Sequence, residues 1–290
     1  MLKYYEGKLQ EAIYGVAIGD ALGVPFEFQE RDDFECTKMI GGGFHGQEYG
    51  TWSDDTSMTL ATIKSLRDNN GEVVIDDIRN NFLAWVNKGE FTVDGKLFDI
   101  GHSTMKALST GQPRMGEYEN GNGSLMRILP LAFTNCSDDE IRAVSAITHG
   151  HEISTEACVI YVHVARRLLG GEGIDSIVCS LEYPAPFDRL SSLASMKRPE
   201  IRSSGYVVDT LEATLWSLVH KVQRSGGSYK EKGFCSDVLR AVNLGGDTDT
   251  VGAVTGGLAA IIYGLEECYQ KGWLTDLRGQ DVIRECLGME

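Results

Sequence analysis

The sequence has little positive charge, and this shortage excludes several kinds of partner. Its 290 residues include 27 Lys and Arg against 42 Asp and Glu, which gives a formal net charge of −15. Nucleic acids and anionic membranes are bound mainly through basic surfaces. We therefore expect no nucleic acid partner, although backbone amides at one place could still hold a small anionic ligand.

Paired cysteines and long apolar runs are also missing. The seven cysteines are scattered, and none forms a Cys-x-x-Cys pair. This pattern is neither a zinc framework nor a disulfide scaffold, and it fits a reducing compartment. No apolar run approaches the roughly 20 residues that span a bilayer, and the first residues lack the apolar segment of a signal peptide. We expect a cytoplasmic protein with no membrane span.

Alternating strand patterns are nearly absent, whereas helical periodicity is common. The expected helices cover residues 7–18, 56–68, 76–87, 154–169, 207–222, 234–243 and 249–263. Ser137-Asp138-Asp139-Glu140 predicts one more helix that begins with a capping box. Residues 31–50 are rich in glycine and are expected to form a loop, and residues 182–204 a long excursion. With 42% hydrophobic residues and no repeat or linker, the chain is predicted to form a single compact all-α domain over residues 1–290.

The stretch from Gly245 to Gly257 places two carboxylates and a hydroxyl at the start of an apolar helix. Asp247, Asp249 and Thr250 follow a pair of glycines that allow a sharp turn. One interpretation is a well-capped buried helix. Two carboxylates this close repel each other, however, unless a cation or a raised pKa relieves them. Hard divalent cations prefer such oxygen ligands, so this stretch is a candidate for half of a metal site.

A second cluster, Ser53-Asp54-Asp55-Thr56, repeats this chemistry at another expected helix start. Each cluster alone could be a helix cap, and separate capping roles are the alternative hypothesis. Together the carboxylates and hydroxyls can hold two divalent ions about 3.5–4 Å apart. Because the set contains oxygen ligands and no histidine, it favours Mg²⁺ or Mn²⁺ over Zn²⁺. We predict a cofactor of two Mg²⁺ or Mn²⁺ ions.

Two glycine-containing loops lead into further helices and suggest an anion site. They contain Gly101, His102, Ser103 and Thr104 after Asp99, and Gly121, Asn122, Gly123 and Ser124 after Glu119. Backbone amides at such helix starts can receive phosphate oxygens. An ordinary turn is the alternative for each loop. Glu27, on a loop after Pro25, is a candidate acid or base.

Four motifs follow one another in a fixed order along the chain. They are Gly15-x-x-x-Gly19-Asp20-x-Leu22-Gly23-x-Pro25-x-Glu27-Phe28, Ser53-Asp54-Asp55-Thr56, Gly121-Asn122-Gly123-Ser124-x-Met126-Arg127 and Gly246-Asp247-Thr248-Asp249-Thr250-x-Gly252-Ala253. This order resembles the ADP-ribosylglycohydrolase family, from about residue 12 to residue 264. The segment from Ser203 to Ala213 resembles the bacterial dinitrogenase reductase-activating branch of that family.

The resemblance implies an orthogonally packed all-α bundle with a binuclear Mg²⁺ or Mn²⁺ centre. Ser53, Asp54 and Asp55 would ligate from one side, and Asp247, Asp249 and Thr250 from the other. Many relatives carry threonine at the position of Ser53, which keeps the hydroxyl. Asp99 would be a catalytic residue beside the substrate ribose. Residues 101–104 and 121–124 would line the ADP-ribose site, and Tyr206 would pack near the nucleotide. His149 would lie behind these residues without touching the ions.

The implied reaction releases ADP-ribose from an ADP-ribosylated protein side chain. A metal-activated water would attack the anomeric carbon, and Glu27 or Asp55 would handle the proton. The glycines between Gly245 and Gly257 would let backbone and ribose share a narrow space above the ions. The Tyr206 segment favours an arginine linkage. Serine, O-acetyl-ADP-ribose and nucleobase linkages are alternatives, as is a non-catalytic ADP-ribose binder. A monomer is favoured, with the oligomeric state left open.

Overall fold

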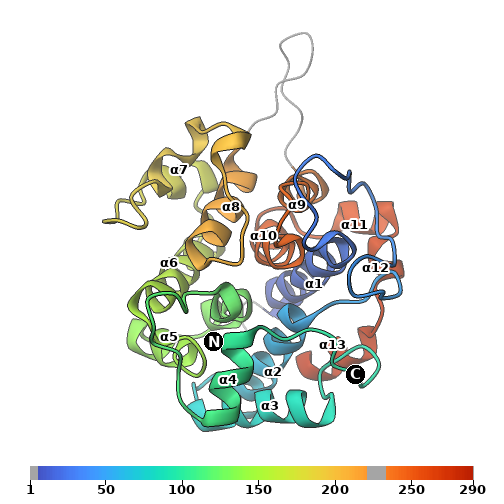
Figure 1. The fold of residues 1–290 in the computed structure, drawn as a ribbon, viewed down its shortest axis with the longest axis vertical. Helices are drawn as coiled ribbons and strands as arrows, with labels where there is room; N and C mark the ends of the chain where they lie inside the picture. The colour runs from blue at the N-terminus through green and yellow to red at the C-terminus, as the bar shows by residue number, and fades with distance from the viewer. Residues whose placement is uncertain (1–5, 221–232, 290) are drawn as a thin grey trace.

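The computed structural model describes residues 6–220 and 233–289 (Figure 1). Within these ranges the chain forms helices and no β-strand, with isolated β-bridges such as that between Gly121 and Tyr206. The all-α prediction is therefore confirmed. The α-helices are α1 (Glu6–Gly23), α2 (Asp54–Asp68), α3 (Ile75–Lys88), α4 (His102–Thr110), α5 (Asp138–Ser145), α6 (Glu152–Leu169), α7 (Ile174–Cys179), α8 (Val207–Val219), α9 (Phe234–Val242), α10 (Thr248–Tyr263), α11 (Glu266–Lys271), α12 (Trp273–Asp276) and α13 (Gln280–Leu287). The 3₁₀ helices are η2 (Val24–Phe26), η3 (Asn122–Arg127), η4 (Leu129–Phe133), η5 (Leu190–Ser195) and η6 (Arg198–Glu200).

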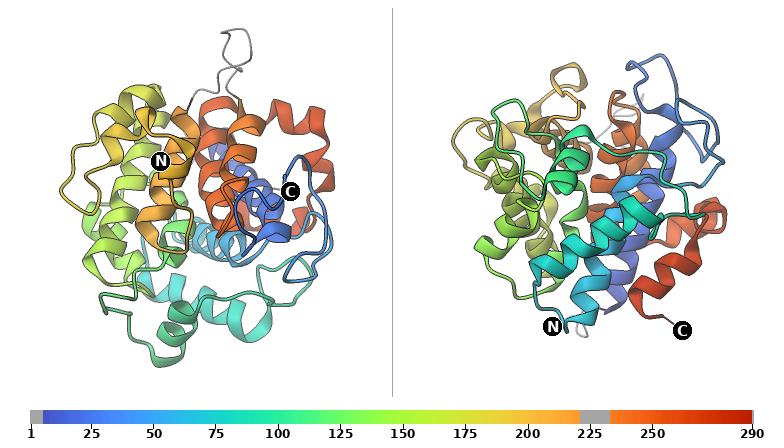
Figure 2. Two further views of the ribbon diagram at one scale, coloured as in Figure 1. Left: turned by 45° about the horizontal axis from the view of Figure 1, so that its top comes forward. Right: turned by 60° about the horizontal axis from the view of Figure 1, so that its bottom comes forward.

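Helices α1 and α10 lie side by side in the middle of the fold and touch through glycine (Figures 1 and 2). A Cβ atom at Gly19 would lie 2.0 Å from the carbonyl oxygen of Gly252, and one at Gly15 would lie 2.4 Å from that of Gly256. No other residue type fits at such a distance, because even an alanine methyl would overlap the facing backbone. Gly252 and Gly256 thus serve helix packing, which corrects the expectation that they make room for a ribose.

The helix predicted over residues 7–18 is longer in the structure than in the prediction. In the structure α1 continues to Gly23, since Gly19 and Gly23 face α10 instead of ending the helix. Glycine ordinarily marks a helix end, but tertiary packing overrides this local preference. Asp20 consequently lies inside a helix and is fully buried.

Most other predicted helices are confirmed, with differences only at their ends. Helices α2, α3, α6, α9 and α10 match the corresponding predictions. Helix α8 ends at Val219, and residues 221–222 of the helix predicted over residues 207–222 lie outside the described residues. The apolar helix expected after the 121–124 loop is instead the pair η3 and η4. Pro130 explains this difference, because proline cannot donate the backbone hydrogen bond of a continuing α-helix. Helices α7 and α11 to α13 were not predicted, since most of them are short.

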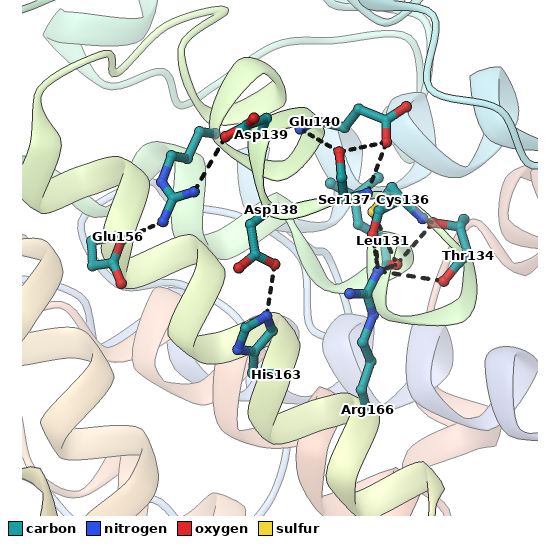
Figure 3. A network of polar contacts seen from close by, with 11 residues as sticks. Leu131, Thr134, Cys136, Ser137, Asp138, Asp139, Glu140, Glu156, His163 and Arg166 are labelled. Atoms are coloured by element: carbon teal, nitrogen blue, oxygen red, sulfur yellow. Dashed lines mark hydrogen bonds and ion pairs between the residues drawn. The ribbon is translucent and has the colours of Figure 1, made fainter. Parts of the chain in front are cut away.

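The capping box at the start of α5 is confirmed (Figure 3). The Glu140 amide donates to Ser137 Oγ at 3.3 Å, and the Ser137 amide donates to Glu140 Oε2 at 2.8 Å. Next to it, His163 of α6 contacts Asp138 at 2.7 Å and Arg166 of α6 donates to the Cys136 carbonyl at 2.8 Å. These contacts fix α5 against α6.

Buried apolar side chains form one continuous cluster that runs from Leu9 in α1 to Cys286 in α13. That residues 1–290 form a single domain stays a prediction. Among the described residues, no helix combines the length and apolar character that crossing a bilayer requires.

Candidate functional site

The two acidic helix starts meet in the structure. Thr250, in the first turn of α10, donates from Oγ1 to Asp55 Oδ2 at 3.4 Å, across 195 positions of sequence. Ser53 Oγ donates to the same carboxylate oxygen at 3.0 Å. The close contact of α1 with α10 supports this arrangement, since a Cβ at Gly23 would lie 2.3 Å from Asp249 Cα. The structure therefore brings together both predicted halves of the metal site.

Carboxylate oxygens form two overlapping groups at this junction. Asp20, Asp55 and Asp249 make one group and Glu27, Asp247 and Asp249 the other, with the oxygen atoms of each group within 4.8 Å of one another. Asp55 Oδ1 is buried and has no hydrogen-bond partner. A buried carboxylate oxygen without a partner is costly, and a cation would satisfy it. The residues therefore fit divalent ions, and their all-oxygen chemistry suits Mg²⁺ or Mn²⁺.

The electrostatics of the site point the same way. Burial, and then repulsion from neighbouring carboxylates, raises the pKa of Asp54, Asp55 and Asp249 well above the ordinary value. The same causes raise the pKa of Glu27 to about 9. Burial raises the pKa of Asp20 to about 7, although hydrogen bonds oppose the shift. So many carboxyl groups cannot all ionise together without a compensating positive charge.

Asp20 was not among the predicted site residues, yet it holds the start of α2 at Ser53 and Thr56. Its Oδ1 accepts the Ser53 amide at 2.9 Å, while its Oδ2 accepts the Thr56 amide at 3.0 Å and the Thr56 hydroxyl at 2.6 Å. These amides belong to the N-cap and the first turn of α2, where no intrahelical acceptor exists. Asp20 thus caps α2 from α1. The Gly19-Asp20 pair was visible as a motif, but the helix boundary predicted there hid its role.

Glu27 and Asp99, both predicted as catalytic, share a histidine that the sequence did not single out. His45 Nε2 lies 2.5 Å from Glu27 Oε2 and 3.9 Å from Asp99 Oδ2. His45 belongs to the glycine-rich loop over residues 31–50, where no periodic pattern indicates what it faces. Glu27 also belongs to the oxygen group of Asp247 and Asp249, so it connects His45 to these two carboxylates.

The loop that begins η3 is tied to the acidic site and to Tyr206. Asn122 Nδ2 donates to Asp247 Oδ2 at 2.8 Å and to Thr210 Oγ1 at 2.9 Å. Its backbone amide donates to the Gly205 carbonyl at 3.0 Å, in the bridge that pairs Gly121 with Tyr206. One predicted ADP-ribose residue, Asn122, therefore contacts the predicted metal ligand Asp247, and two others, Gly121 and Tyr206, pair with each other beside it.

The start of α4 lies against the same loop. A Cβ at Gly123 would lie 2.9 Å from His149 Cε1 and 3.0 Å from Thr104 Oγ1. Gly101 precedes α4, where His102 is exposed and Ser103 half-buried. Ser124 is different: it is fully buried, and its hydroxyl accepts from Ser145 Oγ at 2.9 Å. The side chain of Ser124 therefore faces the core, which corrects its predicted place along the ligand.

Arg127 and His149 support the loop from behind. The Arg127 guanidinium is fully buried; it donates to Thr148 Oγ1 at 2.7 Å and to the Gly123 carbonyl at 3.1 Å, and Nη1 has no partner. Thr148 Oγ1 in turn contacts His149 Nδ1 at 2.8 Å. Burial and the Arg127 charge lower the pKa of His149 to about 3, so the ring is neutral. Arg127 stood in the sequence motif, but nothing in the sequence indicated a buried cation.

The chain matches known proteins over almost its entire length. The family model for ADP-ribosylglycohydrolase covers residues 2–289. The ADP-ribosylarginine hydrolase Tri1 of Serratia proteamaculans is 32% identical, over 95% of this chain and 76% of its own length. The ADP-ribosyl-[dinitrogen reductase] glycohydrolase of Rhodospirillum rubrum is 29% identical, over 92% and 88%. A solved structure described as an ADP-ribosylglycohydrolase-related protein complex superimposes with a TM-score of 0.80 at 30% identity, covering 99% of this chain and 98% of that one.

These matches confirm the predicted fold and the predicted enzyme class, a hydrolase of ADP-ribosyl glycosidic bonds. They agree with the geometry of the site, in which acidic clusters that could hold metal ions adjoin a glycine loop. The chain belongs to the ADP-ribosylglycohydrolase family.

Proposed function

We propose that this protein is a hydrolase, dependent on Mg²⁺ or Mn²⁺, that removes ADP-ribose from arginine side chains of modified proteins. The observation that carries the proposal is the junction of α2 and α10. There Asp249 belongs to both sets of three clustered carboxyl residues, and Asp55 Oδ1 is buried without a hydrogen-bond partner. Two bacterial relatives, those of Serratia proteamaculans and Pseudomonas putida, are named ADP-ribosylarginine hydrolase, and these names support the arginine linkage.

Ser53, Asp54, Asp55, Asp247, Asp249 and Thr250 are the proposed ligands, and Asp20 is added to them as a capping residue or a further ligand. Divalent ions held there would act as Lewis acids and lower the pKa of a water molecule. The chain's part is to fix its oxygens in advance. Asn122 holds Asp247, while Ser53 and Thr250 hold Asp55.

Glu27 is the better candidate for handling the proton. Asp55 is anchored through Oδ2 by two hydroxyls, which suits a ligand, whereas Glu27 follows η2 and shares a hydrogen bond with His45. In the proposed reaction, the bond between the anomeric carbon and the guanidinium nitrogen breaks and a water oxygen bonds to that carbon. The water's proton passes through the Glu27 carboxyl to the leaving nitrogen, so atoms and charge balance.

The loop at Gly121 to Gly123, Tyr206 and the start of α4 are proposed to hold the rest of ADP-ribose. Amides at a helix start attract phosphate oxygens, and the buried Arg127 cation beneath Gly123 adds positive charge to an acidic chain. Holding the diphosphate would orient the ribose toward the ions and Asp99.

The test is hydrolysis of three matched substrates, carrying arginine-, serine- and aspartate-linked ADP-ribose. We expect release from the arginine-linked protein in Mg²⁺ or Mn²⁺ and little after chelation. Faster release from the serine-linked protein would favour the alternative linkage. Tight ADP-ribose binding with no release from any substrate would favour the non-catalytic alternative.

A further inference from the structure

Two phenylalanines lie exposed beside the candidate catalytic residues. Phe28, next to Glu27 in the sequence, is 60% exposed, and Phe44 is 75% exposed. Their ring centroids are 4.9 Å apart, with the rings at 88° to each other. Single exposed apolar residues are ordinary, but two adjacent aromatic rings at the edge of an acidic site indicate a binding surface.

The backbone holds Phe28 in an unfavourable conformation to place its ring there. Its φ is 65°, which is rare for an aromatic residue and costs free energy. The Phe28 amide donates to the Gly246 carbonyl at 2.8 Å, and the Gly246 amide donates to the Gln29 carbonyl at 2.9 Å. Phe28 is therefore fastened to the turn that carries Asp247.

Phe44 is positioned by a second backbone contact. Gly43 has a φ of 70°, and a Cβ there would lie 2.3 Å from the Pro25 carbonyl oxygen. The loop that contains Phe44 thus packs directly on η2, just before Glu27. Both rings are held by the same short segment that carries the proposed proton-handling group.

His45 connects the rings to the carboxylates. Its ring centroid lies 5.1 Å from that of Phe44, 6.1 Å from that of Phe28 and 5.3 Å from that of Phe98. Its Nε2 contacts Glu27 and lies near Asp99. The exposed rings are therefore next to His45, and His45 contacts Glu27, which shares an oxygen group with Asp247 and Asp249.

We propose that Phe28 and Phe44, with Glu27 and Asp99 behind them, form a subsite for the guanidinium of the modified arginine. This inference rests on the proposed function and assigns its leaving-group specificity. A guanidinium is planar and weakly hydrated, stacks on aromatic faces and donates hydrogen bonds to carboxylates. Rings and carboxylates together match this one cation, whereas a serine linkage offers neither charge nor a planar face.

The test uses agmatine, which carries a guanidinium, and N-carbamoylputrescine, its neutral urea counterpart of the same shape. Binding of each to the full chain is measured by NMR in the presence of Mg²⁺ and saturating ADP-ribose. Wild type should prefer agmatine. In a Phe28→Leu/Phe44→Leu variant, which keeps apolar volume and removes the aromatic faces, the affinity for agmatine should fall by about 3- to 30-fold. The affinity for ADP-ribose should stay unchanged.

Tyr269→Leu is the matched control, because Tyr269 is an exposed aromatic residue of α11 that lines a different pocket, with Tyr14 of α1 and Arg284 of α13. It should leave agmatine binding as in wild type. Equal binding of the two ligands by wild type would overturn the inference. So would a loss of ADP-ribose affinity in the double variant with agmatine binding intact, which would assign the rings to the adenine. Absence of hydrolysis on every ADP-ribosyl substrate, with agmatine preferred, would reject the proposed function and leave the guanidinium subsite standing.

Discussion

Asn122 shows how single residues prepare this site. Its amide nitrogen donates to Asp247 and to Thr210 at once, so one side chain orients a proposed ligand and ties it to α8. Groups that hold metal ligands in place affect metal affinity almost as much as the ligands themselves. At this scale the protein's contribution is orientation, supplied by neutral donors around crowded carboxylates.

Asn122→Asp should therefore impair the enzyme, although it only replaces the side-chain amide nitrogen with an oxygen. The new carboxylate would face Asp247 without a hydrogen to donate, and repulsion would displace the ligand. We expect kcat/KM for ADP-ribosyl-arginine to fall by about 10- to 100-fold. Steady-state kinetics over a range of Mg²⁺ concentrations would measure this loss.

Asn69→Asp is the control for that variant. Asn69 Nδ2 also donates to a carboxylate oxygen, Asp77 Oδ2 at 2.9 Å, but it lies at the opposite end of α2. Its replacement should lower stability and leave kcat/KM unchanged. Equal kinetic losses in both variants would show that the effect of Asn122 is general destabilisation.

Individual residues were predictable where the chemistry is local. Asp54, Asp55, Asp247 and Asp249 stood out because two similar clusters of carboxylates and hydroxyls occur at separate helix starts, and such carboxylates repel one another unless a cation relieves them. His45 did not, because its importance comes from Glu27, which meets it only in the folded chain. Ser124 was misplaced for the same reason, since a hydroxyl after glycine can face a ligand or the core equally well.

Helices α1 and α10 carry the site through their glycine contact. Their backbones approach so closely that Asp20 on α1 and Asp249 on α10 fall into one oxygen group. Helices that meet through larger side chains lie about 8–10 Å apart. The glycine spacing of α1 was visible in the sequence, but its partner helix was not, and the helix end was therefore predicted too early.

Gly19→Ala should separate these helices and disrupt the site. A methyl group there would overlap the Gly252 carbonyl oxygen, so the helices must move apart or unfold. Overpacking of this kind costs about 1–3 kcal/mol or more, and thermal unfolding would record it as a lower Tm. Metal-induced stabilisation should shrink along with it.

Gly7→Ala, in the same helix, is the counterpart. Nothing lies within 4 Å of a Cβ at Gly7, so alanine should be neutral or stabilise the helix by up to about 1 kcal/mol. If both alanine variants behaved alike, close packing would not be the reason for glycine at position 19.

When no cation is bound, the buried carboxyl groups of the site repel one another and destabilise the whole folded molecule. Carboxyl pKa values raised in the folded state mean that the folded chain binds more protons than the unfolded chain between the ordinary and raised values. The stability that these groups contribute is therefore greatest at low pH and decreases as the pH rises. The decrease runs from the ordinary carboxyl pKa up to the raised pKa, which is about 7 for Asp20 and about 9 for Glu27.

Stabilisation by Mg²⁺ or Mn²⁺ should accordingly be larger at pH 8 than at pH 5. An ion at 100 times its Kd adds about 2.7 kcal/mol, and each kcal/mol raises Tm by about 2–4 °C for a chain of this size class. Differential scanning calorimetry with and without metal would measure both shifts. An equal shift at the two pH values would contradict this repulsion between the buried carboxyl groups.

Asp249→Asn sharpens this comparison because it removes the one ionisable carboxyl that belongs to both oxygen groups. Without metal at pH 8, the variant should have a higher Tm than wild type. With metal it should gain little. A lower metal-free Tm would mean that Asp249 stabilises the fold directly, and not through a bound ion.

The central claim is that the acidic junction of α2 and α10 makes this protein a metal-dependent ADP-ribosyl hydrolase. The most direct measurement is release of free ADP-ribose from an arginine-linked ADP-ribosylated protein by wild type, Asp54→Ala and Asp249→Ala in excess Mg²⁺. The account predicts rapid release by wild type that chelation abolishes, and a loss of nearly all activity in both folded variants. Release at the wild-type rate by either variant would contradict it.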